Sequence, residues 1–270
     1  MRQTTEDFMK AHADATDHEL ARELVKYAGA LALKMREAGV GTDYKTSISD
    51  VVTDADRAAE EFVARALTQL RPNDGMLGEE GATRESNTGR VWVIDPVDGT
   101  YNFASGSDYF CSALALIDGD PSDPDDLLLG AVHRPVLDIT WLGSLEGSTR
   151  NGVQLQRLVD KPLAEISVAS YLHPTSMTQP AIRDAWLRGV QGAATIRMFG
   201  AGSIDLASVA SGNVGAWLQH SVADWDWLPG KILVEGVGGA AEKVTAGGVE
   251  WCVAGSHQAV SEIASALSSD

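Results

Sequence analysis

The sequence predicts a protein of the α+β or α/β class, in which sheets are layered with helices. Two observations support this prediction. In the first half of the chain helical patterns precede a long run of strand patterns, whereas in the second half strands and helices alternate. The chain has 270 residues, of which 44 % are hydrophobic, and it can therefore bury at least one substantial core. We divide it into an N-terminal α+β part, residues 1–158, and a C-terminal α/β part, residues 159–270.

The first half begins with helices. Apolar residues from Leu20 to Met35 recur at helical spacing and predict an amphipathic helix over residues 17–37, which Gly39 ends. The polar stretch TDYKTSISD that follows predicts an exposed loop. A second helix is expected from about Asp54 to Leu70, with Thr53 as its N-cap and an Arg-Pro pair closing it.

Strand patterns follow these helices. They are MLGEE, VWVIDP, ALALI, LLLGAVHRP and DITWLG, and we expect VWVIDP to stop at Pro96. The acidic segment DGDPSDPDD, rich in turn-forming residues, predicts a hairpin-like excursion between two of the strands. In the second half, strand patterns at 166–169, TIRMFG, VGAWLQ and VEWCVAGS alternate with helical patterns at 181–189, GSIDLASVASG, DWLPGKILVEGVGG and HQAVSEIASAL.

Composition limits the partners and the compartment. A net charge of −17 argues against nucleic acid, because binding to a phosphate backbone needs a basic face. The charged N-terminus has no apolar region typical of a secretory signal, and no apolar run approaches the roughly 20 residues of a membrane-spanning helix. Cys111 and Cys252 lie far apart in apolar surroundings, which favours buried free thiols and a cytoplasmic location.

The segment WVIDPVDGTYNF, residues 92–103, carries the strongest chemical signal. A buried strand delivers Asp95, Asp98 returns three residues later, and Gly99 and Thr100 then begin an expected helix. Two carboxylates at this spacing can converge on one side of a turn and share hard cations through oxygen ligands. The small Gly99 lets a ligand approach the backbone, and free amides at a helix start bind phosphate oxygens. The alternative is an Asp-Gly turn in which Asp95 caps a helix.

Three further acidic positions could join this segment. Glu79 ends a short strand, Asp56 lies in the first turn of a helix, and Asp226 stands at the entry of a helix after a strand. Each also has a structural explanation. Glu79 can belong to a solvated acidic loop, Asp56 can stabilise its helix start through the helix dipole, and Asp226 can be an N-cap.

In this order and at these spacings, the segments resemble the inositol monophosphatase family. The wider superfamily also contains histidinol-phosphate, adenosine-bisphosphate and fructose-bisphosphate phosphatases. The resemblance runs from KTSISDVVTDAD at residue 45 through WDWLPG at residue 230, and DPVDGTYNF is nearly the family's first signature. It implies a layered αβαβα sandwich and a magnesium-dependent phosphoric monoester hydrolase. It also implies inhibition by lithium and a homodimer.

The resemblance assigns roles to individual residues. Metal ligands would be Glu79, Asp95, the carbonyl of Val97, Asp98 and Asp226, holding two Mg²⁺ ions, with a third, weaker ion near Glu79 and Mn²⁺ as a substitute. Thr100 and Asp56 would position and deprotonate the attacking water, and Glu79 would be a third catalytic residue. Substrate contacts would come from Asp98, Gly99, Thr100, Gly200, Ala201, Gln219 and Asp226. Lys45 would lie in a mobile loop that closes over the metals.

Two departures from the family pattern bear on the second part. Family members usually read WDxAAG where this chain has WDWLPG; Asp226 is kept, and Pro229 is expected near the first turn of a helix, where proline is tolerated. Gln219 stands where inositol-preferring enzymes carry a Glu that binds sugar hydroxyls.

These features leave a choice of substrate. We expect inositol monophosphate or a similar polyol phosphate, acted on by metal-activated water. Histidinol phosphate is the alternative, because VTDADRAAE and RPNDGMLGEE resemble actinobacterial histidinol-phosphate phosphatases; other sugar or nucleotide phosphates remain open. A catalytically inactive metal- or phosphate-binding relative is the alternative outside the enzyme class.

Overall fold

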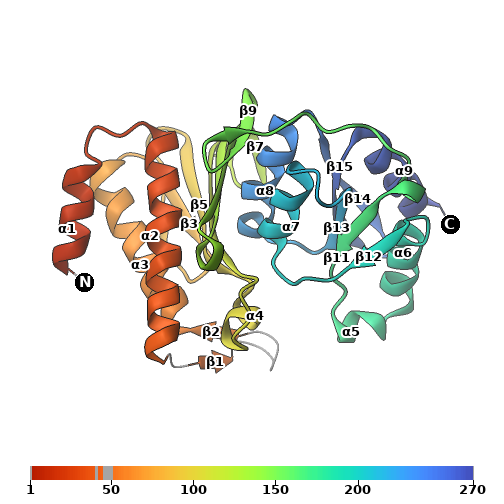
Figure 1. Ribbon diagram of the computed structural model, residues 1–270, viewed down its shortest axis with the longest axis horizontal. Coiled ribbons are helices and arrows are strands. Elements are labelled where there is room, and N and C mark those ends of the chain that lie inside the picture. Colours follow the sequence, from red (N-terminus) through yellow and green to blue (C-terminus); the bar gives the residue numbers. More distant parts are fainter. Residues whose placement is uncertain (1, 40–41, 45–50, 270) are drawn as a thin grey trace.

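Helices and sheets alternate in five layers along the longest axis of the molecule (Figure 1). A computed structural model describes residues 2–39, 42–44 and 51–269. Helices α1–α3 form one outer layer, an eight-stranded sheet the next, α7 and α8 the middle layer, a five-stranded sheet the fourth, and α6 and α9 the other outer layer. The predicted layered αβαβα sandwich is confirmed.

The elements of the first half are arranged as helices followed by strands. In chain order they are α1 (Arg2–Ala11), α2 (Asp17–Ala38), β1 (Thr42–Tyr44), β2 (Val51–Thr53), α3 (Asp54–Leu70), β3 (Gly75–Gly78), β4 (Thr83–Arg84), β5 (Arg90–Asp98), α4 (Thr100–Ala104), β6 (Cys111–Asp120), β7 (Asp123–Arg134), β8 (Ile139–Ser144), β9 (Gly147–Arg150) and β10 (Val153–Gln154).

The elements of the second half alternate. They are β11 (Ser167–Ser170), α5 (Pro174–Met177), α6 (Pro180–Val190), β12 (Thr195–Arg197), α7 (Gly202–Ala210), β13 (Ala216–His220), α8 (Asp224–Gly236), β14 (Ala240–Ala246), β15 (Val249–Gly255) and α9 (His257–Ser268). Short 3-10 turns lie at Pro135–Leu137 and Leu163–Glu165. Because β10 ends well before β11 begins, the two sheets fall on either side of residues 155–166, and we retain the division at 158/159 as a proposal.

Helix α3 begins and ends where the sequence predicts. The Thr53 side chain accepts the backbone N–H groups of Ala55 and Asp56, and the Asp56 carboxylate accepts the N–H of Thr53 at 3.0 Å, which completes a capping box. Arg71 is the C-cap. The apolar face of α3 packs with α2 against Trp92 and Ile94 of β5, and this packing fixes the helix over the sheet.

The eight-stranded sheet has the order β10-β9-β8-β7-β6-β5-β3-β4, in which only β3 and β5 run parallel. Both of its faces are covered, so successive residues of β5 enter different cores. Trp92 and Ile94 face α2 and α3, whereas Val93 packs in the core shared with α7 and α8. The carboxyl end of β5 is thereby placed between the outer and the middle helical layers.

The expected end of this strand at Pro96 is wrong. Strand β5 continues to Asp98, with an irregularity in its pairing to β6 between Asp95 and Asp98. Pairing with β3 on the other side ends at Ile94, so the missing N–H of Pro96 disrupts no ladder there. A bulge of this kind re-aims side chains, and here it lies between the two aspartates.

Other differences from the sequence predictions are local. Helix α1 and strand β14 were not predicted, and Thr42–Tyr44, expected in a loop, pairs with β2. The acidic hairpin is confirmed, but its strands extend so far that only Pro121 and Ser122 connect them. Cys111 and Cys252 are buried free thiols, as expected.

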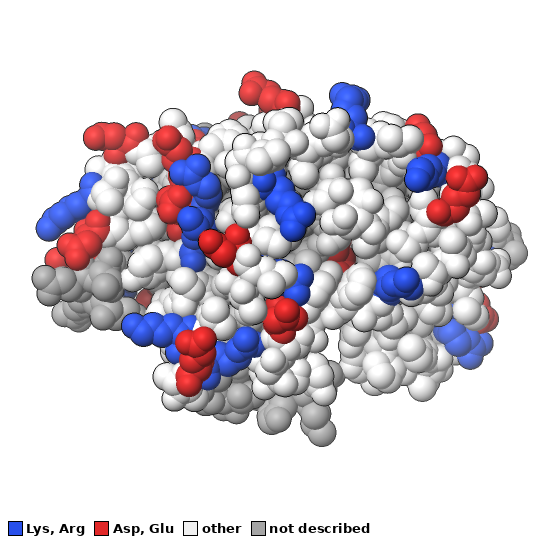
Figure 2. Space-filling view, in the orientation of Figure 1, with Lys and Arg blue, Asp and Glu red and all other residues white. Residues whose placement is uncertain are grey.

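On the face drawn in Figure 2, basic and acidic side chains are interspersed, and the residues coloured there form no continuous basic patch. None of the helices in the described ranges combines the length and apolarity that crossing a bilayer requires.

Helix α8, which carries Asp226, packs closely on β7 at Gly130. A Cβ at Gly130 would lie 2.4 Å from both the Pro229 carbonyl oxygen and Ile232 Cγ2. The backbone of α8 therefore sits against the sheet at a distance that only glycine permits.

We predict that Gly130→Ala destabilises the protein by about 1–3 kcal/mol, because the methyl group must push α8 away from β7. Urea unfolding followed by circular dichroism measures this. Gly192→Ala is the matched control, since its Cβ would meet only the tip of the Leu163 side chain, and we expect a change within about 0.5 kcal/mol. Equal effects of the two substitutions would contradict the packing described here.

Candidate functional site

Three carboxylates from two distant segments meet at the end of β5. Asp95 and Asp98 come from the bulged end of that strand, and Asp226 comes from the first turn of α8. One oxygen from each of the three lies within 4.8 Å of the other two. Asp95 is 1 % exposed and Asp98 is 6 % exposed, so both carboxylates are removed from solvent.

Glu79 reaches the same region because β3 runs parallel to β5. Gly78 is the register partner of Ile94, and the Glu79 N–H donates to the Ile94 carbonyl at 3.2 Å. Glu79 follows Gly78 just past the end of β3, and Asp95 follows Ile94 within β5, so the two acids lie on neighbouring segments at the same edge of the sheet. Glu79 lines a pocket together with Asp98 and Asp226, although it is not one of the three converging carboxylates.

Burial and crowding raise the pKa values of these acids. Burial raises the pKa of Asp95 well above its ordinary value, and the nearby charges of Glu79, Asp98 and Asp226 raise it further. Burial also raises the pKa of Asp98, although backbone N–H donors oppose this. Like charges gathered out of water repel one another unless a cation lies among them. Hard divalent cations bind such all-oxygen sets, so the donor chemistry fits an ion of the Mg²⁺ type.

The orientation of Asp98 is fixed by the start of α7. Its carboxylate accepts the N–H of Ser203 at 2.6 Å and the N–H of Gly202 at 3.2 Å, and the Cys111 thiol donates to it at 3.7 Å. These amides are among the first of the helix, where N–H groups have no partner within the helix and favour negative charge. Helix α7 therefore holds one carboxylate of the cluster in place.

Thr100 and Asp56 form the expected hydroxyl–carboxylate pair. The Thr100 hydroxyl lies 3.2 Å from Asp56 Oδ1 and 2.9 Å from the carbonyl oxygen of Val97, and it can donate to either. The other oxygen of Asp56 accepts from the backbone and side chain of Thr53. Burial raises the pKa of Asp56 to about 6, against the opposing effect of the Thr53 hydrogen bonds. Asp56 thus caps α3 and also contacts Thr100.

Gly99 connects the strand to α4 in a conformation that other residues rarely adopt. Its φ is +86°, and an added Cβ would lie 3.0 Å from Ala201 Cβ and 3.1 Å from the Tyr109 carbonyl oxygen. Both the backbone angle and the space therefore require glycine. This close approach brings α4 against the segment that precedes α7.

A pocket of about 920 Å³ opens beside the carboxylates. All seven residues predicted to contact substrate line it, and so does Glu79. Asp56, Asp95 and Val97 are not part of its wall and reach it only through the neighbours just described. The wall also contains side chains that the sequence did not indicate, namely Tyr101, Asn102, Tyr171, His173, Pro174, Met198 and Phe199.

Two residues that the sequence did not indicate link neighbouring segments, Asn102 in the pocket wall and Asp205 outside it. The Asn102 side-chain amide donates to the Phe199 carbonyl at 2.8 Å and lies 3.2 Å from that of Gly200, so it ties α4 to the entry of α7. Asp205 accepts the Tyr109 hydroxyl at 2.7 Å, and burial raises its pKa to about 8. The available signal was the position of Asn102 two residues after the DGT segment; nothing in the sequence singled out Asp205.

Several structural alternatives can now be decided. Asp226 is not an N-cap, because α8 begins at Asp224 after Ala223. Asp95 does not cap α4, whose N-cap is Gly99. Pro229 lies inside α8 rather than near its first turn, so the expectation for its position is wrong. Because proline has no N–H, the carbonyl of Trp225 has no helical donor four residues later. Lys45 lies outside the described residues.

The Trp-rich start of α8 is accommodated by another tryptophan. Trp227 is buried and stacks on Trp217 of β13, with ring centroids 5.7 Å apart and planes 20° apart. Offset stacking of this kind is a favourable arrangement for two aromatic rings. The departure from the family pattern at WDWLPG is therefore matched by packing between α8 and the second sheet.

Comparisons with known proteins agree with this geometry. The model of the inositol monophosphatase family matches residues 14–268. A histidinol-phosphatase of Mycobacterium tuberculosis is 34 % identical over 235 residues, covering 85 % of this chain and 83 % of its own. An inositol-1-monophosphatase of Bacillus subtilis is 26 % identical over 82 % of this chain and 83 % of its own. The crystal structure of the extragenic suppressor protein SuhB from Bartonella henselae superposes with a TM-score of 0.80 at 23 % identity, covering 91 % of this chain and 96 % of that one.

We predict that Asp226→Asn stabilises the cation-free protein, because removing one charge relieves repulsion on Asp95. In EDTA at neutral pH we expect a gain of about 1 kcal/mol, which raises the melting temperature by about 2–4 °C. With MnCl₂ the order should reverse, because the wild type gains more from the ion than the variant does.

Asp224→Asn is the control for this experiment. Asp224 occupies the same turn of α8 but lies outside the three-carboxylate group, so its variant should respond to MnCl₂ as the wild type does. An Asp226→Asn protein that melts below the wild type in EDTA would contradict the repulsion inferred here.

Proposed function

The chain belongs to the inositol monophosphatase family and is a phosphoric monoester hydrolase, and from that premise we propose that it hydrolyses a small phosphorylated metabolite with the help of bound magnesium. The observation that carries the proposal is the meeting of Asp95, Asp98 and Asp226 within 4.8 Å, beside a pocket of about 920 Å³. Proposed ligands are Glu79, Asp95, the carbonyl of Val97, Asp98 and Asp226.

Charge supports the need for cations. The protein carries a net charge of −17, and a phosphate monoester is a dianion that such a surface repels. Bound divalent ions reverse the local charge, polarise the phosphoryl oxygens and lower the pKa of a coordinated water. The three crowded carboxylates supply the negative charge that would hold those ions.

The proton of the attacking water would leave through Thr100. A water that donates to Thr100 Oγ1 leaves the hydroxyl free to donate its own proton to Asp56 Oδ1, 3.2 Å away. With a pKa of about 6, Asp56 is mostly ionised at neutral pH and can accept. The Val97 carbonyl, at 2.9 Å, competes for the same hydroxyl proton, so the relay operates when the hydroxyl turns toward Asp56.

The phosphate and the alcohol would occupy different parts of the pocket. The backbone at Gly99 and Thr100 lines the wall beside Asp98 and is proposed to bind phosphate oxygens through its N–H groups. Gly200, Ala201 and Gln219 line the same pocket and are proposed to contact the alcohol portion.

Inositol monophosphate or another polyol phosphate is the first candidate substrate. The amide of Gln219 both donates and accepts hydrogen bonds, which suits hydroxyl groups, and it carries no charge. A solved relative, the inositol monophosphatase II of Staphylococcus aureus, has been crystallised with inositol monophosphate; its fold matches this chain at a TM-score of 0.76.

Histidinol phosphate is the second candidate, and a specific feature of the pocket favours it. Tyr101, Tyr171 and Phe199 line the pocket and are between 37 % and 57 % exposed, so flat rings are available on its wall. An imidazole ring can stack on such surfaces. The protonated amine of histidinol phosphate, however, would form no ion pair with the neutral Gln219, whose carbonyl oxygen can offer only a hydrogen bond.

The proposal extends to the metal ions, an inhibitor, the assembly and the compartment. Two to three Mg²⁺ ions would be replaceable by Mn²⁺, lithium would inhibit, and the chain would form a homodimer in the cytoplasm. The buried free state of Cys111 and Cys252 suits a reducing compartment. Sedimentation at twice the chain mass of 28.6 kDa checks the dimer, and LiCl against NaCl at equal ionic strength checks the inhibition.

We predict magnesium-dependent release of phosphate from p-nitrophenyl phosphate, lost in EDTA and reduced at least about 100-fold in Asp98→Asn. The loss follows because Asp98 is a proposed metal ligand, and an ion at the reacting phosphate contributes several kcal/mol to transition-state stabilisation. Asp126→Asn, an exposed acid of the β6–β7 hairpin, is the control and should keep full activity. Folded wild type that binds magnesium but releases no phosphate would instead support the inactive, binding-only relative.

A second prediction concerns substrate choice. In a panel of inositol 1-phosphate, histidinol phosphate, fructose 1,6-bisphosphate and adenosine 3′,5′-bisphosphate, we expect inositol 1-phosphate to give the highest kcat/KM. Gln219→Glu should raise kcat/KM for histidinol phosphate about tenfold relative to inositol 1-phosphate, because a carboxylate there can bond the ammonium group.

Gln191→Glu is the control for this substitution, since Gln191 is exposed and lies outside the pocket. A wild-type preference for histidinol phosphate would transfer the assignment to the second candidate. A preference that Gln219→Glu leaves unchanged would remove Gln219 from the substrate contacts.

A further inference from the structure

Helix α3 carries a second buried acid, one turn beyond Asp56. Glu60 is 3 % exposed, although its neighbours on that face, Ala59 and Val63, are apolar core residues. Residues four apart lie on the same side of a helix, so Asp56 and Glu60 both face the sheet. A buried carboxylate is costly unless it is hydrogen-bonded.

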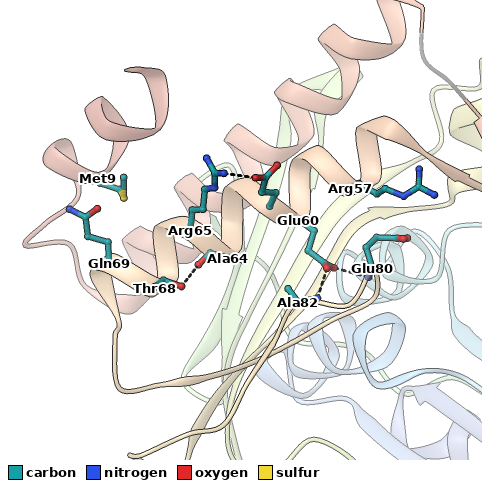
Figure 3. A pocket seen from close by; sticks show the side chains of 10 residues that line it. Met9, Arg57, Glu60, Ala64, Arg65, Thr68, Gln69, Glu80 and Ala82 are labelled. Carbon is teal, nitrogen blue, oxygen red and sulfur yellow. Dashed lines mark hydrogen bonds and ion pairs between the residues drawn. The ribbon is translucent and has the colours of Figure 1, made fainter. Parts of the chain in front are cut away.

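Glu60 finds its partners in the turn that follows β3. Its Oε2 accepts the N–H of Glu80 at 2.8 Å and its Oε1 accepts the N–H of Ala82 at 2.7 Å (Figure 3). Both oxygens of one carboxylate are therefore committed to the same short turn. Hydrogen bonds to an ionised acceptor are stronger than those between neutral groups.

The fit between this carboxylate and the turn is close. A Cβ on Gly78, the last residue of β3, would lie 2.4 Å from Glu60 Oε2 and 2.6 Å from its carboxyl carbon. The turn closes on itself through the Gly78 N–H, which donates to the Ala82 carbonyl at 2.7 Å. Glu79 lies inside this turn. It stands between Gly78, which packs against the Glu60 carboxylate, and Glu80, whose N–H donates to that carboxylate.

Helix α3 thus contacts both strand ends that build the site. Asp56 meets Thr100, just past β5, and Glu60 binds the turn just past β3, while β3 and β5 are themselves paired up to Gly78 and Ile94. Any shift of the turn relative to α3 would change how far Glu79 reaches toward Asp95.

We infer that Glu60 is a positioning residue, which holds the turn after β3 so that Glu79 meets the cation bound by Asp95. The inference rests on the proposed function, in which Glu79 is a metal ligand. Glu60 itself touches neither substrate nor ion; its effect is on the affinity for the cation that Glu79 binds.

The test measures Mn²⁺ binding to the cation-free protein by titration calorimetry. In Glu60→Gln the side-chain NH₂ must face one of the two backbone N–H donors, and in Glu60→Asp the shorter side chain cannot reach both. We expect the dissociation constant to rise about 10–100-fold in both variants. Glu61→Gln is the matched control, because the adjacent Glu61 is exposed and paired with Arg65, and its affinity should equal that of the wild type.

Kinetics separate positioning from a general loss of structure. In the Glu60 variants the Mg²⁺ concentration for half-maximal activity should rise with the dissociation constant, while kcat at saturating Mg²⁺ stays near that of the wild type. A purely structural defect would lower the active fraction and leave the half-saturating concentration unchanged.

The outcomes are distinct. Glu60 variants that fold in EDTA and bind Mn²⁺ as the wild type does would overturn this inference alone. Variants that are both unfolded in EDTA would also overturn it, because Glu60 would then be a residue of the core. A wild type that binds no Mn²⁺ would overturn the proposed function, and this inference with it.

Discussion

Electrostatic repulsion among buried and half-buried carboxylates is the constraint on which the site depends. Asp95, Asp98 and Asp226 converge within 4.8 Å, and Glu79 is close enough to raise the pKa of Asp95. Such a group is unfavourable by itself, and its orientation must be enforced by the surrounding fold. Backbone N–H groups at the start of α7 bind Asp98, and the Val97 N–H donates to Asp95 at 3.0 Å. These donors stabilise individual carboxylates, and divalent cations would stabilise the group.

The layered fold brings the four acids together from three directions. The parallel pair β3 and β5 delivers Glu79 and Asp95 at one sheet edge, and the bulge of β5 places Asp98 beyond them. Helix α8 lies in the middle layer, packed through Gly130 and Ile232 against the same sheet, and contributes Asp226 from its first turn. The site therefore forms only when the outer helices, the first sheet and the middle helices are all in place.

The sequence predicted those features that local rules determine. Helix α3 was predicted near its observed bounds, because Thr53 is a typical N-cap and Arg71-Pro72 closes the helix. The continuation of β5 past Pro96 was missed. A strand can contain a proline where no neighbouring strand needs its N–H, and here the pairing with β3 has already ended at Ile94. That pairing is not visible in the local sequence. Helix α1 was missed because its polar sequence offers little beyond Phe8, whose ring packs edge-on against Phe62 at 5.1 Å.

The same distinction applies to the site residues. Glu79, Asp98, Asp226 and the predicted substrate contacts all line one pocket. They could be named from the sequence because it resembles a family whose model matches nearly the whole chain. Glu60 and Asp205 were not indicated, since an acid becomes notable only when its helix face proves to be buried. The aromatic wall formed by Tyr101, Tyr171 and Phe199 was likewise beyond local pattern, because its members come from α4, the loop after β11 and the segment before α7.

The most direct test of this account is a crystal structure of the protein soaked in MnCl₂, with an anomalous difference map. The account predicts anomalous peaks among Asp95, Asp98 and Asp226, and between Asp95 and Glu79, with carboxylate oxygens at coordination distance from each. A map with no peak in this region, and with the four side chains directed to separate places, would contradict it.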